Sequence, residues 1–151
     1  MQLDDLYRQV IMDHYQHPRN QGSIGGETLS IDLKNPTCGD EITLQMKIED
    51  GLVTDVRFTG TGCSISLASA SMMTEAIKGK PVAEAMEISE EFRRMMKGEE
   101  FDADRLGDLE SLAGVCRFPA RIKCATLAWY ALERGADKKS GDHHTMRRSL
   151  E

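Results

Sequence analysis

Residues 41–59 read EITLQMKIEDGLVTDVRFT, and they decide the fold class. Polar residues in the first half of this stretch alternate with four apolar ones, namely Ile42, Leu44, Met46 and Ile48. This two-residue period is typical of a β-strand with one buried face. Asp50-Gly51 favours a tight turn, and a second strand-like run follows over 52–59. The stretch therefore predicts an antiparallel β-hairpin.

The segments around the hairpin complete a small α+β domain. A third strand-like run lies upstream at 28–33. Apolar residues with helical spacing begin at Leu3 and predict a helix that ends near His17. Downstream, helical patterns cover 65–77, 82–97, 109–115 and 119–134, and a cap at Ser89 is expected to divide the second of these helices. We expect a small three-stranded antiparallel sheet with helices packed on one face.

Length and charge narrow the class of protein. The 151 residues suit one domain, which we place at 1–135, followed by a polar tail at 136–151 that we expect to be disordered. The net charge of −6 argues against a nucleic-acid-binding protein. The first residues lack a signal-peptide pattern, and no apolar run reaches the roughly 18 residues of a membrane span. We expect a cytoplasmic protein with protein partners, whose four cysteines are not paired in disulfides.

Cys38 is our candidate for the reactive thiol. It lies in the motif Asn-Pro-Thr-Cys-Gly-Asp between two predicted strands, where a side chain is less often buried than inside a strand or helix. Asp40 follows two residues later, so both side chains can bind one ion if Gly39 permits a tight bend. The alternative is a small buried cysteine beside an ordinary loop acid.

Cys63 stands where the third strand passes into a helix, in the motif Thr-Gly-Thr-Gly-Cys-Ser. Gly60 and Gly62 give the backbone freedom to turn there. The positive end of a helix dipole favours the thiolate form of a cysteine at a helix N-terminus. A phosphate-binding loop is the alternative, but no Lys-Ser or Lys-Thr follows the glycines.

Cys124 falls in the second turn of the last predicted helix, within Phe-Pro-Ala-Arg-Ile-Lys-Cys. Arg121 precedes it by three residues and shares its helix face, so the guanidinium can stabilise a nearby thiolate or persulfide. The alternative is a surface arginine over a packed cysteine. Cys116 has no acid, histidine or glycine hinge beside it, and we interpret it as structural or as a resolving thiol.

Cys38, Asp40, Cys63 and Cys124 together supply four anionic ligands from distant segments of the chain. A tetrahedral metal site needs four ligands, and zinc favours thiolate sulfur with an occasional carboxylate. The sequence therefore predicts a Zn²⁺ site in a folded pocket.

These motifs, in this order, resemble the SufU branch of the IscU/NifU-like superfamily of iron–sulfur cluster assembly proteins. The resemblance extends from Val-Ile-Met-Asp-His-Tyr, which begins at Val10, to Leu-Ala-Trp at Trp129, and it stops before the tail. Two departures from the housekeeping scaffold pattern favour the SufU branch. The residue before the third cysteine is Lys123 instead of histidine, and the segment between Cys63 and Cys124 is longer.

The resemblance implies a SufE/NifU/IscU-like fold and a zinc-dependent sulfurtransferase. Its implied partner is a pyridoxal-phosphate-dependent cysteine desulfurase of the SufS type, whose histidine would replace Cys38 on zinc and free that thiolate to accept persulfide sulfur. A downstream sulfur or cluster acceptor of the Suf system would follow. Two alternatives remain open: a scaffold on which the same four residues hold an iron–sulfur cluster, and a closed structural zinc site without transfer chemistry.

Overall fold

The structure, a computed structural model, describes residues 2–25, 29–36, 39–139 and 147–149. Its sheet is built on β1 (Leu29–Asn35), β2 (Asp40–Glu49) and β3 (Leu52–Thr61), paired antiparallel. Asp50 and Gly51 both have positive φ angles, 51° and 77°, as the turn of a tight hairpin requires. The predicted hairpin and the three-stranded antiparallel sheet are confirmed. Thr28, the predicted start of the first strand, lies outside the described residues.

A fourth strand extends the sheet beyond the prediction. The short β4 (Arg147–Ser149) pairs parallel with β1, so that the strand order is β3-β2-β1-β4. The last helix, α5 (Pro119–Lys139), continues past the predicted end at Arg134, and the domain boundary expected at residue 135 falls inside it. Residues 140–146 of the expected disordered tail lie outside the described part of the chain.

The remaining predicted helices are present in the predicted order. They are α1 (Gln2–Gln16), α2 (Ser64–Ile77), α3 (Val82–Met96) and the 3₁₀ helix η1 (Gly107–Arg117). The single-turn α4 (Ala103–Leu106), between α3 and η1, was not predicted. The helix break expected at Ser89 is wrong, because α3 is continuous there. The Ser89 hydroxyl donates to Glu133 Oε2 at 2.9 Å instead of capping a new helix.

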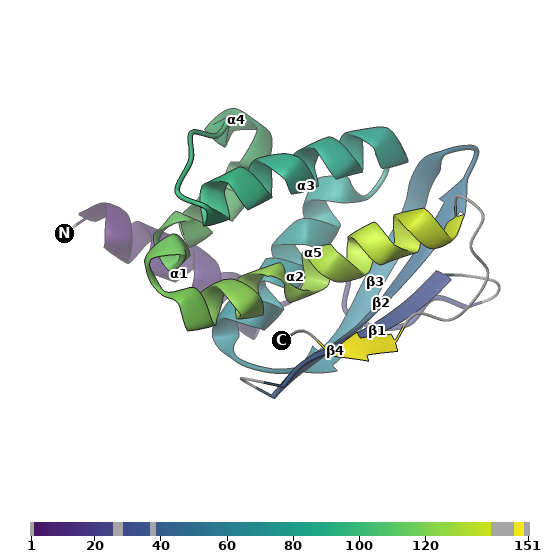
Figure 1. Cartoon of the computed structure of the whole chain (residues 1–151), viewed down its shortest axis with the longest axis horizontal. Helices are drawn as coiled ribbons and strands as arrows, with labels where there is room; N and C mark the ends of the chain where they lie inside the picture. Colours follow the sequence, from purple (N-terminus) through teal and green to yellow (C-terminus); the bar gives the residue numbers. More distant parts are fainter. Residues whose placement is uncertain (1, 26–28, 37–38, 140–146, 150–151) are drawn as a thin grey trace.

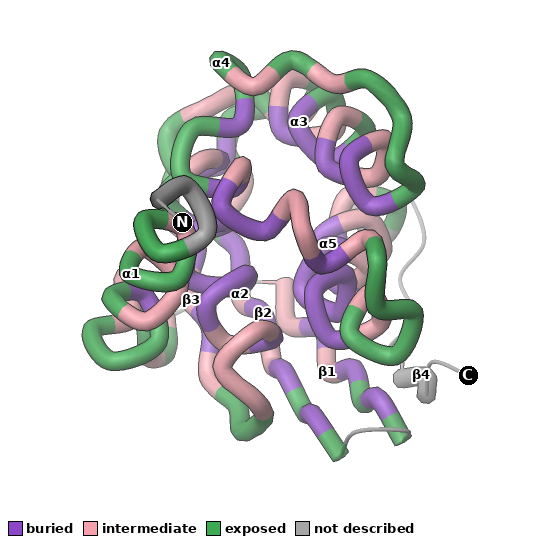
Figure 2. Tube along the Cα trace, turned by 90° about the vertical axis from the view of Figure 1, so that its left-hand side faces the viewer, coloured by how far each residue is buried: buried purple, intermediate pink, exposed green. Residues whose placement is uncertain are grey.

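The helices cover one face of the sheet, as predicted (Figure 1). α2 and α5 pack against the strands, α1 packs on α2, and α3 lies on the side of α2 and α5 that faces away from the sheet. Buried residues gather between these layers (Figure 2). Trp129 on α5 is fully buried and stacks on Phe92 of α3 with ring centroids 4.7 Å apart, which joins the outer helix to the core.

A buried histidine ties α1 to the rest of the domain. His14 is 1% exposed, and its two ring nitrogens lie 2.8 Å from Ser71 Oγ on α2 and 3.1 Å from Asp108 Oδ2 on η1. The backbone N–H of Arg19 also donates to Ser71 Oγ, at 2.9 Å. These bonds fix α1 against α2 and η1.

Candidate metal centre

Three of the four predicted metal ligands meet at one end of the sheet. Asp40 begins β2, Cys63 directly precedes α2, and Cys124 lies in the second turn of α5. One carboxylate oxygen and the two Sγ atoms all lie within 4.8 Å of one another. The fold therefore places side chains from distant segments close enough to bind a single ion.

Asp40 is held in place by bonds from both sides. Its side chain is buried, and Oδ1 accepts a hydrogen bond from the backbone N–H of Cys63 at 3.0 Å. Oδ2 accepts from Asn35 Nδ2 at 3.5 Å. Asn35 and Asp40 are register partners at the adjoining ends of β1 and β2, so the sheet itself aligns them. Strand register and the start of α2 together orient this carboxylate.

Cys63 occupies the N-cap position of α2 and is half-buried. The two glycines before it allow a close approach of backbone and ligand. A Cβ on Gly60 would collide with the carbonyl oxygen of Glu41, and one on Gly62 would lie 2.6 Å from Asp40 Oδ1. The glycines therefore make room for the site, in addition to allowing the predicted turn.

Cys124 is fully buried on the inner side of α5. Its Sγ lies 3.8 Å from the carbonyl oxygen of Ala120 and 3.9 Å from Asn35 Nδ2. Asn35 thus contacts two of the three ligand residues, a role that was not predicted from the sequence. Its place in the motif beside Cys38 and Asp40 was the available signal.

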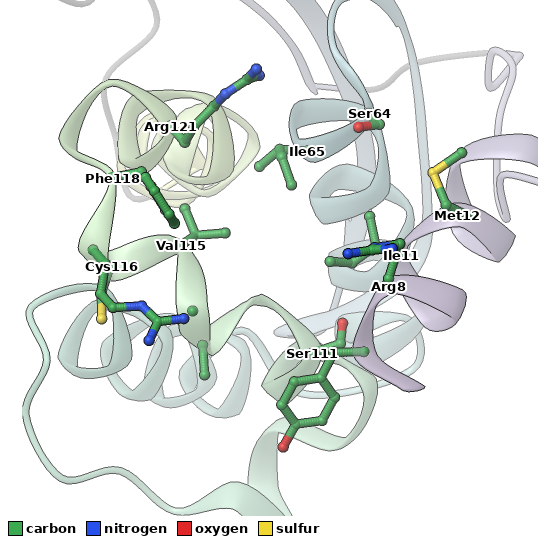
Figure 3. A pocket seen from close by; sticks show the side chains of 14 residues that line it. Arg8, Ile11, Met12, Ser64, Ile65, Ser111, Val115, Cys116, Phe118 and Arg121 are labelled. Atoms are coloured by element: carbon green, nitrogen blue, oxygen red, sulfur yellow. The ribbon is translucent and has the colours of Figure 1, made fainter. Parts of the chain in front are cut away.

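The other candidates fall at the edge of the centre or outside the described residues. Cys38 lies in a part of the chain that the structure does not describe. Arg121 lies on the first turn of α5, is exposed, and sits at the rim of a neighbouring cavity (Figure 3). Cys116 is half-buried in the wall of the same cavity and is not part of the ligand cluster.

The donor set fits zinc. Two thiols and one carboxylate, largely withdrawn from solvent, match the sulfur and oxygen ligands that zinc accepts in tetrahedral sites. Within the described ranges a second group, His14, Glu75 and Asp108, also has potential ligand atoms within 4.8 Å. It contains no sulfur, and both nitrogens of its histidine already have hydrogen-bond partners.

Known proteins are similar to this chain in sequence over most of its length. The family of NifU-like N-terminal domains matches residues 6–125. The zinc-dependent sulfurtransferase SufU of Bacillus subtilis is 57% identical over 140 residues, covering 92% of this chain and 95% of that protein. The iron–sulfur cluster assembly scaffold protein IscU of Streptococcus pyogenes is 43% identical, covering 94% of this chain and 89% of that protein.

A solved structure supports the same relationship. A crystal structure from Fervidobacterium islandicum, named as a candidate scaffold protein for iron–sulfur cluster assembly in the SUF system, superposes with a TM-score of 0.81 at 38% identity. The alignment covers 84% of this chain and 93% of that one. As for membrane association, none of the helices in the described ranges combines the length and the apolar character needed to cross a bilayer.

Proposed function

We propose that this chain, which belongs to the family of NifU-like N-terminal domains as a SufU-type member, is a zinc-dependent sulfurtransferase that accepts persulfide sulfur from a cysteine desulfurase for iron–sulfur cluster assembly. The observation that carries this proposal is the meeting of Asp40, Cys63 and Cys124 at one point. The identity of 57% to a zinc-dependent sulfurtransferase supports the choice of metal and of activity.

Asp40, Cys63, Cys124 and Cys38 would hold the zinc. Cys38 is two residues from Asp40, and two residues span at most about 7 Å, so covalent geometry alone keeps this thiol near the other three ligands. When bound, zinc stores its sulfur ligands as thiolates and makes them less nucleophilic than free thiolates.

The three described ligands each belong to, or directly precede, a regular element of the fold. Asp40 begins a strand, Cys63 caps a helix, and Cys124 is buried within a helix. Cys38 falls between the end of β1 at Asn35 and the start of β2 at Asp40. We therefore assign sulfur acceptance to Cys38, and retention of the ion to the other three.

The transfer step exchanges one sulfur–sulfur bond for another. The Cys38 thiolate attacks the terminal sulfur of a persulfide carried by the desulfurase, the S–S bond within that persulfide breaks, and the cysteine of the desulfurase leaves as a thiolate. No oxidant is consumed. Cys38 then carries the persulfide for a downstream acceptor of the Suf system. Such chemistry requires free thiols, which is consistent with the cytoplasm as the place of action.

Mass spectrometry tests the proposal directly. After the zinc-loaded protein is mixed with a SufS-type cysteine desulfurase and cysteine, the peptide that contains Cys38 should gain the mass of one sulfur atom. Cys38→Ala should accept none, whereas Cys116→Ala should behave like the wild type. Sulfur found only on Cys116 would overturn the assignment.

A scaffold for cluster assembly is the second candidate. It is supported by the identity of 43% to a scaffold protein, and three cysteines with one aspartate can also hold an iron–sulfur cluster. Metal analysis of protein purified in air separates the candidates. One zinc per chain together with faster desulfurase turnover supports the transferase. Iron with acid-labile sulfide supports the scaffold, and zinc without any stimulation supports a purely structural site.

A further inference from the structure

A cavity of about 730 Å³ (Figure 3) is lined in part by residues that neighbour two of the candidate metal ligands in sequence. Its walls come from α1, η1 and the first turns of α2 and α5. Ser64 and Ile65 of the wall directly follow Cys63, and Arg121 precedes Cys124 by three residues. The cavity and the metal centre therefore share the starts of the same two helices.

The inside of this cavity is largely apolar. Figure 3 shows Val115 and Phe118 on one side, with Ile11 on α1 across from them and Ile65 on α2 between. Phe118 is 57% exposed, which leaves a large aromatic surface in contact with water. Exposed apolar surface of this kind, rimmed by polar residues, marks an interaction site in soluble proteins.

Among the residues that the structure describes, the charged side chains of the cavity are all positive. Arg8, Arg117 and Arg121 line it, and no described aspartate or glutamate does, although the whole chain has a net charge of −6. Five other arginines, namely Arg19, Arg57, Arg93, Arg94 and Arg105, each form an ion pair with a carboxylate. Among the described residues neither Arg8 nor Arg117 has such a partner. Two guanidinium groups at the cavity therefore have no carboxylate partner within the described part of the chain.

We propose that this cavity receives an acidic segment of the cysteine desulfurase, in which a carboxylate side chain lies next to an apolar one. Carboxylates of the segment would pair with Arg8 on α1 and with Arg117 on η1, and the apolar side chain would pack among Ile11, Ile65 and Phe118. Arginine suits this role because its planar guanidinium binds a carboxylate through two parallel hydrogen bonds. A small free anion would leave the apolar walls uncovered.

This docking surface rests on the proposed function and makes it more specific. Sulfur must pass between two proteins, so the desulfurase has to be held while its persulfide reaches the thiols. A contact bordering the metal centre fixes the direction of approach. Arg8 and Arg117 act on association, since complementary charges speed the encounter and orient the partner, and they take no part in bond exchange.

Charge reversal tests the proposal. Arg8 and Arg117 are both exposed, so Arg8→Glu/Arg117→Glu should keep the zinc content and the melting temperature of the wild type. Its Kd for a purified SufS-type desulfurase, measured by titration calorimetry at low salt, should rise at least about tenfold, and the difference should shrink at high salt. At saturating desulfurase, sulfur transfer should match that of the wild type.

Two further variants make the experiment specific. Lys47→Glu/Lys97→Glu has the same change of net charge at exposed residues that do not line the cavity, and it should bind like the wild type. Phe118→Ala removes the exposed aromatic surface and should weaken binding without altering the salt dependence.

Three results would overturn the docking proposal. One is wild-type affinity in Arg8→Glu/Arg117→Glu, and another is an equal loss of affinity in the lysine control. The third is a shift of oligomeric mass in light scattering caused by the arginine variant, which would assign the cavity to a second copy of this chain. A wild-type protein that neither binds nor stimulates any desulfurase would instead contradict the proposed function itself, and the docking site with it.

Discussion

Asp40 Oδ1 accepts a hydrogen bond from the backbone N–H of Cys63 at 3.0 Å, which joins the first residue of β2 to the N-cap of α2. The same carboxylate is one of the three clustered metal ligands. Asp40 therefore has two separable roles: it satisfies a backbone donor at the start of a helix, and it contributes negative charge to the ion site.

Asp40→Asn and Asp40→Ala should separate these roles. The amide oxygen of asparagine can still accept from Cys63 N–H, so the zinc-free Asn variant should unfold in urea like the zinc-free wild type. The Ala variant should lose about 1–3 kcal/mol, because a buried donor is left without a partner. Both variants should bind zinc more weakly in competition with a chromophoric chelator. Equal urea midpoints for the two zinc-free variants would contradict the structural role.

Zinc removal should destabilise the domain, because the ligands connect β2, α2 and α5. Binding to the folded state alone contributes about 2.7 kcal/mol when free zinc is a hundredfold above its Kd. Dialysis against a chelator should therefore lower the melting temperature seen by calorimetry, and added zinc should restore it. Cys63→Ser/Cys124→Ser provides the control, since its melting temperature should respond to neither treatment.

Much of this fold is predictable from local patterns. The alternation Ile42, Leu44, Met46 and the Asp50-Gly51 turn specify the hairpin, because strand period and turn chemistry depend on neighbouring residues only. The expected break in α3 was wrong because Ser89 bonds to Glu133, a residue distant in sequence. Local capping rules contain no information about such a partner.

The candidate centre likewise has features that local sequence predicts and others that only the tertiary structure shows. Its ligand types were readable from the three cysteine motifs, but the contacts of Asn35 with Asp40 and Cys124 depend on strand register and on the placement of α5. That Arg8 and Arg117 have no carboxylate partner among the described residues is also a tertiary property. It depends on the positions of the carboxylates in the folded chain, which no local sequence pattern predicts.

Gly60→Ala should perturb both the fold and the metal centre. A methyl group at this position would collide with the carbonyl of Glu41 and lie 3.1 Å from Ile42 Cα, both on the facing strand β2 next to Asp40. Overpacking of this kind costs typically about 1–3 kcal/mol. We expect a lower free energy of unfolding in urea and weaker zinc binding. Gly25→Ala is the matched control, because nothing lies within 4 Å of its added methyl; if both variants unfold alike, the steric argument is wrong.

Ser69→Ala should destabilise the core and change the fluorescence of Trp129. The buried Ser69 hydroxyl donates to the carbonyl of Ala125 at 2.6 Å and accepts from Trp129 Nε1 at 3.1 Å. Without it, the indole N–H is left buried and unpaired, which costs about 1–3 kcal/mol. Trp129 is the single tryptophan of the chain, so its fluorescence reports this site alone.

For Ser69→Ala we expect a lower urea midpoint together with a shift of the native emission maximum, since the indole loses its polar partner. Ser23→Ala at an exposed position should change neither quantity. A native emission spectrum in Ser69→Ala identical to that of the wild type would mean that the hydroxyl does not hold the indole. In that case the stacking of Trp129 on Phe92 would be sufficient to place α5 against α3.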